Sequence, residues 1–337
     1  MVRKFTNLVT LPLPLLSFLA IPFVGGSSST VNFVIFWFIW SALVASHDPL
    51  TVEIGGLALI RTLFFLLPAL GFLAFDCALP GMSKKLKASG RSQLPLHLGR
   101  DKLLHVVAVA VCNVLLSVVV QGGLELLATR LLHLRSLVRV TAMVPLPWNL
   151  VKDVVKGYVL QGVLRYFIHR HLLHTYASPC QKNHLAWTHS LSFPFSIAAA
   201  YDHPMNYLLL SWLPVVLPAY FFRFHVLSLH IITAIVSLQE LLVFSGYTVL
   251  PLPILLGGMA RRQEDHFDST TAGKPGNFGQ LGLLDLFLGT TCADDDDVVA
   301  DAQQEADRHN VKERVEDKVN AAAGARRRSN RRGRGRA

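Results

Sequence analysis

Long apolar segments constrain the fold of this chain more than any other feature of its sequence. Residues 54–75 and 103–121 each have the length of about 20 residues that a helix needs to cross a bilayer, and Arg61 is the one Lys, Arg, Asp or Glu within them. Only 16% of the residues are charged, against about 25% in soluble domains, which excludes an ordinary soluble protein and a disordered one. Further apolar runs lie at residues 31–46, 205–222 and 226–250. We therefore predict an all-α fold, a polytopic bundle of membrane helices.

Charged and apolar segments divide the chain into three predicted parts. Residues 1–145 form an N-terminal membrane-spanning region with a basic loop at residues 79–102, which the positive-inside rule places in the cytosol. Within this part, residues 122–140 alternate leucines with arginines, which predicts an amphipathic segment in the membrane interface. Residues 146–292 carry most of the histidines, and residues 293–337 form a charged, Arg-rich tail that we expect to be disordered. The net charge of +10 lies mainly beside apolar segments and in this tail, so we expect a membrane partner and no nucleic acid.

The predicted topology gathers histidines from distant parts of the sequence. With residues 79–102 in the cytosol, residues 103–121 lead to the opposite face, and the helix that starts near Trp148 returns. The last apolar pair then crosses and comes back, so residues 169–203 and His266 share one cytosolic face as a histidine-rich cap. Imidazole suits iron, copper and zinc, and the scarcity of neighbouring thiolates and carboxylates favours iron or zinc. The sequence therefore predicts a metal site just outside the bilayer.

The spacing of the histidines predicts where the helices become irregular. His169 and His174 are five residues apart, as are His184 and His189. On a regular helix such a pair points about 140° apart, whereas His171 and His174, three residues apart, lie on one face. Each five-residue pair converges only where the helix contains a π-bulge or ends locally. We therefore predict one of these irregularities at each pair.

Several motifs occur together in a fixed order and resemble those of a known family. They are Tyr166–His174 (YFIHRHLLH), His184–His189 (HLAWTH), Asp202–Pro204 (DHP), Ser245–Tyr247 (SGY), Gly276–Gly279 (GNFG) and Asp285–Thr290 (DLFLGT). The chain resembles the fatty acid hydroxylase / sterol desaturase superfamily over about Val154–Thr290. Outside the histidines, we interpret Asn277 as a turn residue. Asp285 is either a helix-start residue, which we favour, or an acceptor that orients a metal-bound histidine.

The resemblance implies an enzyme of the endoplasmic reticulum membrane with several spans. Members of the superfamily hold a two-metal, usually di-iron, centre on the cytosolic face. They use O2 and electrons, commonly from cytochrome b5, to hydroxylate or desaturate sterols, fatty acyl chains or sphingoid lipids. On this interpretation the partners are a membrane lipid substrate and cytochrome b5 or a reductase, and residues 193–201 and 205–222 line an apolar substrate channel.

The resemblance also implies which residues hold the metal. The matching positions are His169, His174, His184, His189, His203 and His266. Further candidate ligands are His171, Glu240 and Asp265. Glu240 stands out because a carboxylate in a membrane helix is energetically expensive.

Four positions depart from the pattern of the superfamily. Thr188, Phe244, Arg262 and Asp265 stand where the pattern has histidine. The sequence therefore leaves two functions open: an O2-dependent, iron-dependent lipid hydroxylase or desaturase, or a catalytically degenerate member that binds lipid or acts as a scaffold. Hydrolytic zinc chemistry ranks last, because no glutamate accompanies the histidines in an HExxH pattern.

Overall fold

The computed structural model of the chain describes residues 29–87, 94–247 and 253–292. This part of the chain is all helical and contains no strand, which confirms the predicted fold class. Two isolated β-bridges, Lys87 with Tyr247 and Arg139 with His225, tie loop residues to the helices. The predicted disordered tail, residues 293–337, lies outside the described residues.

Three helices of the described part are long and apolar enough to cross a membrane: Pro49–Ala78, Arg100–Leu131 and Val226–Phe244. The first consists of α4 (Pro49–Arg61), a π-turn (Thr62–Leu66) and α5 (Leu67–Ala78). The second consists of α7 (Arg100–Leu126) and a π-turn (Leu127–Leu131). The third is α12 (Val226–Phe244). The first two contain the predicted segments 54–75 and 103–121, and the third covers residues 226–244 of the predicted segment 226–250. Helix α4 begins in an ordinary way, with Asp48 accepting a hydrogen bond from the backbone N–H of Thr51 and Pro49 in the first turn.

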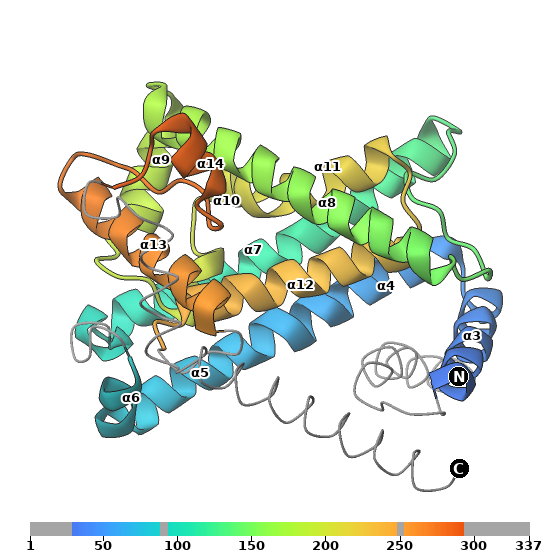
Figure 1. Cartoon of the computed structure of the whole chain (residues 1–337), viewed down its shortest axis with the longest axis horizontal. Coiled ribbons are helices and arrows are strands. Elements are labelled where there is room, and N and C mark those ends of the chain that lie inside the picture. Colours follow the sequence, from blue (N-terminus) through green and yellow to red (C-terminus); the bar gives the residue numbers. More distant parts are fainter. Residues whose placement is uncertain (1–28, 88–93, 248–252, 293–337) are drawn as a thin grey trace, which may run out of the picture.

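These three helices form one layer of the bundle, and α8 lies across it. Figure 1 shows α4 and α5 beside α12, with α7 behind, and α8 (Pro147–Phe167) and α11 (Leu213–Phe221) on the other side of α12. Two glycines allow this close packing. A Cβ on Gly157 of α8 would lie 2.4 Å from Ile232 Cδ1, and one on Gly56 of α4 would lie 2.2 Å from His230 Cε1. The helices therefore approach each other at positions that exclude any side chain.

Shorter helices cover one end of the bundle. They are α9 (Pro179–Trp187), α10 (Pro204–Tyr207), α13 (Pro253–Thr271) and α14 (Leu283–Leu288), whereas α3 (Ser29–Ser46) lies at the opposite end (Figure 1). An apolar cluster that includes Phe195, Phe244 and Phe267 fills the covered end. A second cluster, which includes Trp40 and Val226, fills the end near α3.

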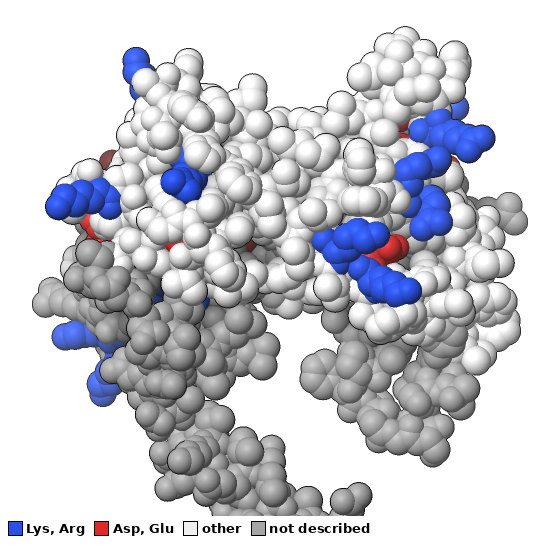
Figure 2. All heavy atoms as spheres, turned by 45° about the horizontal axis from the view of Figure 1, so that its top comes forward, with Lys and Arg blue, Asp and Glu red and all other residues white. Residues whose placement is uncertain are grey.

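The outer surface of the bundle suits a lipid environment. Leu104, Leu115 and Val119 of α7 are exposed, as is Leu67 of α5. Figure 2 shows a broad face without Lys, Arg, Asp or Glu, with positive side chains gathered towards its two ends. An uncharged belt between charged ends is what the hydrocarbon layer of a bilayer requires. The described part of the chain is thus an all-α membrane bundle.

Two expectations about the segments between the spans are wrong. Residues 122–140 do not form a separate interfacial helix, because α7 and its π-turn continue to Leu131 and the chain is irregular after it. Residues 193–201 do not line a channel, because Phe195, Ile197 and Ala200 are fully packed in the core.

Candidate metal centre

Five histidines from four helical segments meet at the covered end of the bundle. One ring nitrogen of each lies within 4.8 Å of a ring nitrogen of every other member: His169, His174, His184, His189 and His266. Four of them are buried and the fifth is half-buried. We call this group the five-histidine cluster. It contains five of the six histidines that the motif comparison singled out.

A π-helix explains the convergence of the first pair. His169 and His174 lie in a π-helical segment, Ile168–Thr175, that continues α8. A π-helix closes its turn at i+5 rather than i+4, so residues five apart share one face. The two imidazole rings are consequently 4.9 Å apart. The irregularity predicted from the spacing is confirmed.

The second pair converges because its helix ends between the two histidines. His184 lies in α9, which ends at Trp187, and His189 lies in the following 3-10 turn, Thr188–Ser190. The change of helix type rotates the second ring back towards the first, and their centroids are 4.9 Å apart. This is the local helix end that the sequence predicted as the alternative to a π-bulge.

Three of the rings are oriented by acceptors outside the cluster. His169 Nδ1 donates to the Phe278 carbonyl at 2.8 Å, and His266 Nδ1 donates to the Gly276 carbonyl at 2.6 Å. His184 Nδ1 lies 2.6 Å from Asp202 Oδ2. Because these oxygens accept hydrogen bonds, they hold the proton on Nδ1 and leave the Nε2 lone pair for the cluster. Histidines that bind metals are oriented in this way.

The nitrogens that face the cluster have no hydrogen-bond partner within the described residues. This applies to Nε2 of His174, His184 and His266 and to both ring nitrogens of His189, all of them buried atoms. Buried polar atoms in native proteins normally have partners, and leaving several together without one is costly. A metal ion would satisfy them, so the residues fit a metal centre.

Burial keeps these imidazoles in their neutral, metal-binding form. Loss of solvent, reinforced by the neighbouring imidazoles, lowers the pKa of His169, His174 and His189 well below the ordinary value. The same burial lowers the pKa of His266 to about 4, although its hydrogen bond to Gly276 opposes the shift. A metal ion therefore does not have to displace protons from these four ligands at neutral pH.

The GNFG segment supplies the backbone acceptors, and Asp285 holds that segment in place. Asp285 accepts hydrogen bonds from the backbone N–H of Phe278 at 2.8 Å, from that of Gly279 at 2.7 Å and from the Thr290 hydroxyl at 2.8 Å. Asn277 adopts a left-handed backbone with φ of 54°, which confirms its interpretation as a turn residue. Asp285 lies in the first turn of α14, as its interpretation as a helix-start residue predicted, although Gly282 is the N-cap. The carboxylate of Asp285 anchors the loop whose carbonyl orients His169.

The remaining candidate histidines lie outside the cluster. His203 is the N-cap of α10, and its ring packs edge-on against Trp187 with centroids 5.7 Å apart. His171 is stacked between Phe167 and Tyr176. The π-helix that brings His169 and His174 together turns His171 towards these aromatic rings.

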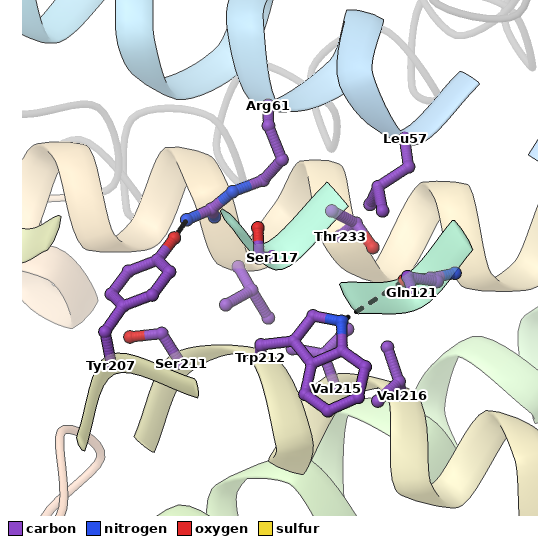
Figure 3. Close-up of a pocket in the computed structure, with 11 residues that line it drawn as sticks. Leu57, Arg61, Ser117, Gln121, Tyr207, Ser211, Trp212, Val215, Val216 and Thr233 are labelled. Carbon is purple, nitrogen blue, oxygen red and sulfur yellow. Dashed lines mark hydrogen bonds between the residues drawn. The ribbon is translucent and has the colours of Figure 1, made fainter. Parts of the chain in front are cut away.

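Neither candidate carboxylate belongs to the cluster. Glu240 is buried in α12 and pairs with two arginines, Arg61 Nη1 at 3.3 Å and Arg165 Nη1 at 3.0 Å. Arg61 also donates to the Tyr207 hydroxyl at 2.6 Å, as Figure 3 shows. Glu240 thus joins α4, α8 and α12. Asp265, although adjacent to His266, contributes no oxygen to the group.

A small pocket with a mainly apolar wall lies beside this arginine network within the bundle. Arg61, Tyr207, Ser211 and Gln121 line it together with apolar residues (Figure 3). Its volume of about 20 Å³ is enough for a single water molecule. It is far too small for a lipid, although Ser211 belongs to the segment that the sequence assigned to a substrate channel.

Comparison with known proteins agrees with the motifs. Residues 154–290 match the family model described as fatty acid hydroxylase. No solved structure matches the chain. The matched region contains all members of the five-histidine cluster, the GNFG segment and Asp285. This match confirms the resemblance to the fatty acid hydroxylase / sterol desaturase superfamily over residues 154–290.

Proposed function

We propose that the protein is an O2-dependent lipid oxidoreductase whose metal, iron, is held by the five-histidine cluster. The fatty acid hydroxylase domain supports a lipid-modifying oxidoreductase in general terms. The observation that carries the finer proposal is the set of five imidazole nitrogens within 4.8 Å of one another. Several of these nitrogens are buried without any other partner in the described residues.

Iron suits both the donors and the reaction. Imidazole nitrogens bind iron well, and iron supplies the reactivity towards O2 that oxidation of an unactivated C–H bond requires, which no side chain can supply. The reaction consumes O2 together with two electrons and two protons. It releases water and either a hydroxylated or a desaturated lipid, and an external donor such as cytochrome b5 supplies the electrons. The proposal includes a location in the endoplasmic reticulum membrane with the cluster on the cytosolic side.

An apolar cavity beside the cluster supports a lipid substrate. It has a volume of about 280 Å³ and lies between α8 and the segment from Gly279 to Phe287. Its outer rim carries exposed apolar side chains, among them Phe287, which is 80% exposed, and Leu283. Gly279, which lines the cavity, directly follows Phe278, whose ring contacts the rings of His169, His174 and His266. We propose that an acyl or sterol chain binds in this cavity, near the segment that orients His169.

One specific observation favours a second function, that of a lipid-binding or scaffolding protein without chemistry. Thr188, Phe244 and Arg262 stand where the superfamily pattern has histidine. We rank this function below the enzyme, because the cluster retains neutral, oriented imidazoles with no other structural use in the described residues.

The decisive experiment supplies iron, O2 and an electron donor to the full chain in detergent or nanodiscs, with membrane lipid extracts as substrates. Isotopically labelled O2 and mass spectrometry identify oxidised or desaturated products. We expect products from the wild type and from His203→Ala, and none from His184→Ala. Bound lipid without any product from iron-loaded wild type would support the second function instead.

A further inference from the structure

The five-histidine cluster differs from the two-metal centre that its superfamily leads one to expect. We infer that the cluster binds a single metal ion. This inference rests on the proposed function, in that it takes the cluster to be a metal centre. It concerns how many ions the residues of this chain can hold.

The distances within the cluster are much nearer to those in the ligand shell of one ion than to those around a pair of ions. With metal–nitrogen bonds of about 2.1 Å, nitrogens on opposite sides of one ion are about 4.2 Å apart. Paired ions lie about 3.5–4 Å apart, so nitrogens at the outer ends of a pair are separated by about 6–8 Å. In this protein no pair of the five ligand atoms exceeds 4.8 Å. The cluster is too compact to surround two ions.

The number of donors leads to the same conclusion. Five imidazoles can complete one shell but would leave fewer than three for one ion of a pair. The other candidates have different contacts. His203 caps α10, His171 is stacked between aromatic rings, and Glu240 pairs with two arginines.

The residues that replace histidine of the superfamily pattern have packing or hydrogen-bonding roles in the fold. Thr188 is buried and donates its hydroxyl to the Tyr201 carbonyl at 3.0 Å. Phe244 belongs to the apolar core, with its ring 6.3 Å from that of Phe267. These side chains fill the space and satisfy the hydrogen bonds around them, so they leave no donors for a second ion.

Arg262, at a third position where the superfamily pattern has histidine, is a buried residue that supplies no ligand. It precedes His266 by one turn of α13, so the two side chains lie on the same face. It is 6% exposed. Gly282, with φ of 72°, makes room for it, since a Cβ there would lie 2.6 Å from Arg262 Nε. A guanidinium stays protonated in proteins and has no acceptor lone pair, so this position offers no donor to a second ion.

The test is the metal content of the intact chain. The protein is purified in detergent, stripped of metal, loaded anaerobically with iron(II), freed of excess and analysed for iron and protein. We expect about one iron per chain. His174→Ala should lose most of the bound iron, whereas His171→Ala, in the same π-helix but outside the cluster, should keep it. Loading with cobalt(II) should give the electron paramagnetic resonance signal of an isolated ion.

The possible outcomes separate this inference from the proposed function. Two irons per chain, or the signal of a coupled cobalt pair, would overturn the single-ion inference and leave the proposed function standing. Absence of bound iron in wild-type protein that remains monodisperse would overturn both. The wild-type ratio decides the question even where a variant fails to fold.

Discussion

His184 of the five-histidine cluster pairs with Asp202 of a neighbouring loop, with Nδ1 and Oδ2 2.6 Å apart. Asp202 Oδ1 accepts a second hydrogen bond from the backbone N–H of His203 at 2.7 Å. The backbone carbonyl of Asp202 accepts a hydrogen bond from Asn113 Nδ2 of α7 at 2.8 Å. The carboxylate is therefore fixed between a membrane helix and the cluster. It orients one ligand and leaves that ligand's Nε2 directed inward.

Replacement of Asp202 should weaken metal binding while the cluster remains assembled. We expect Asp202→Ala to lower iron affinity about 10–100-fold, the usual effect of losing the acceptor behind a metal-bound histidine. Competition with a calibrated chelator measures this affinity. The matched control is Asp268→Ala, an exposed aspartate on α13, which should leave the affinity unchanged. Equal affinities for both variants would contradict the assigned role of Asp202.

Asp285 should control both stability and the metal site, because it anchors the loop that carries the Phe278 carbonyl. Asp285→Ala removes three accepted hydrogen bonds from a fully buried position. At about 1–3 kcal/mol for each unsatisfied buried donor, we expect the free energy of unfolding to fall by at least about 3 kcal/mol. Thr290→Val, which removes only one of these donors, should have the smaller effect on thermal unfolding. A larger effect for Thr290→Val would refute this ordering.

Glu240 should act on stability rather than on metal content. Glu240→Gln leaves Arg61 and Arg165 buried without their shared carboxylate, and breaking a buried ion pair in this way costs about 3–5 kcal/mol. The midpoint of thermal unfolding in detergent should fall markedly. A triple variant with leucine at all three positions should be more stable than Glu240→Gln, since it removes the unpaired charges. A loss of iron from folded Glu240→Gln would indicate that Glu240 is a ligand after all.

Filling the apolar cavity should block lipid binding without disturbing the helix that forms its wall. Gly162 of α8 lines the cavity, and a Cβ at this position meets no atom within 4 Å. We expect Gly162→Phe to weaken binding of a fluorescent fatty acid to the metal-free protein by about tenfold or more. Gly71→Phe, at an equally open position on α5, is the matched control. Unchanged binding by Gly162→Phe would place the lipid elsewhere.

His225 should make stability depend on pH at the opposite end of the bundle. Its Nδ1 accepts the backbone N–H of Leu227 as the N-cap of α12, and its Nε2 lies 3.2 Å from Thr141 Oγ1. Burial, assisted by Arg139, lowers the pKa of His225 from 6.5 to about 4. The unfolded chain therefore binds a proton at a higher pH than the folded one. The contribution of His225 to the free energy of unfolding is fully present above about pH 6.5. It is lost as the pH falls towards 4, and the loss reaches about 3 kcal/mol.

The comparison variant for this prediction is His225→Asn. Asparagine keeps a capping oxygen and does not titrate, so its unfolding free energy should change less between pH 6.5 and pH 4. Chemical unfolding of both proteins in the same detergent across this window measures the difference. Parallel curves would show that His225 does not contribute the expected slope.

Local patterns predicted the parts of this protein that depend on local geometry. The lengths of the apolar segments identified the three long helices. A helix needs about 20 apolar residues to cross a bilayer. The five-residue spacing of His169–His174 and of His184–His189 predicted a π-helical segment and a local helix end, and both are present. These conclusions follow from helix periodicity alone.

Contacts between distant residues were beyond such patterns. The sequence around a single histidine or carboxylate does not show which residues its side chain contacts. His203 and Glu240 therefore could not be distinguished from the members of the five-histidine cluster. Asp285 accepts a hydrogen bond from the backbone N–H of Phe278, 7 residues earlier. This contact and the cavity beside Gly162 depend on how the last segments fold over α8. The expected channel at residues 193–201 was wrong for the same reason.

By itself the sequence determined a helical membrane bundle with a histidine-rich end, because hydrophobic length and motif order are properties of the chain. Only the tertiary structure decided which imidazoles meet, which of their nitrogens face inward and which charges surround them. The compact group of five rings arises where the π-helical end of α8 meets α9, the turn after it and α13. The packing of α4, α8 and α12 holds Glu240 between Arg61 and Arg165. Metal binding depends on distances of a few ångströms between residues far apart in the sequence, and folding alone sets those distances.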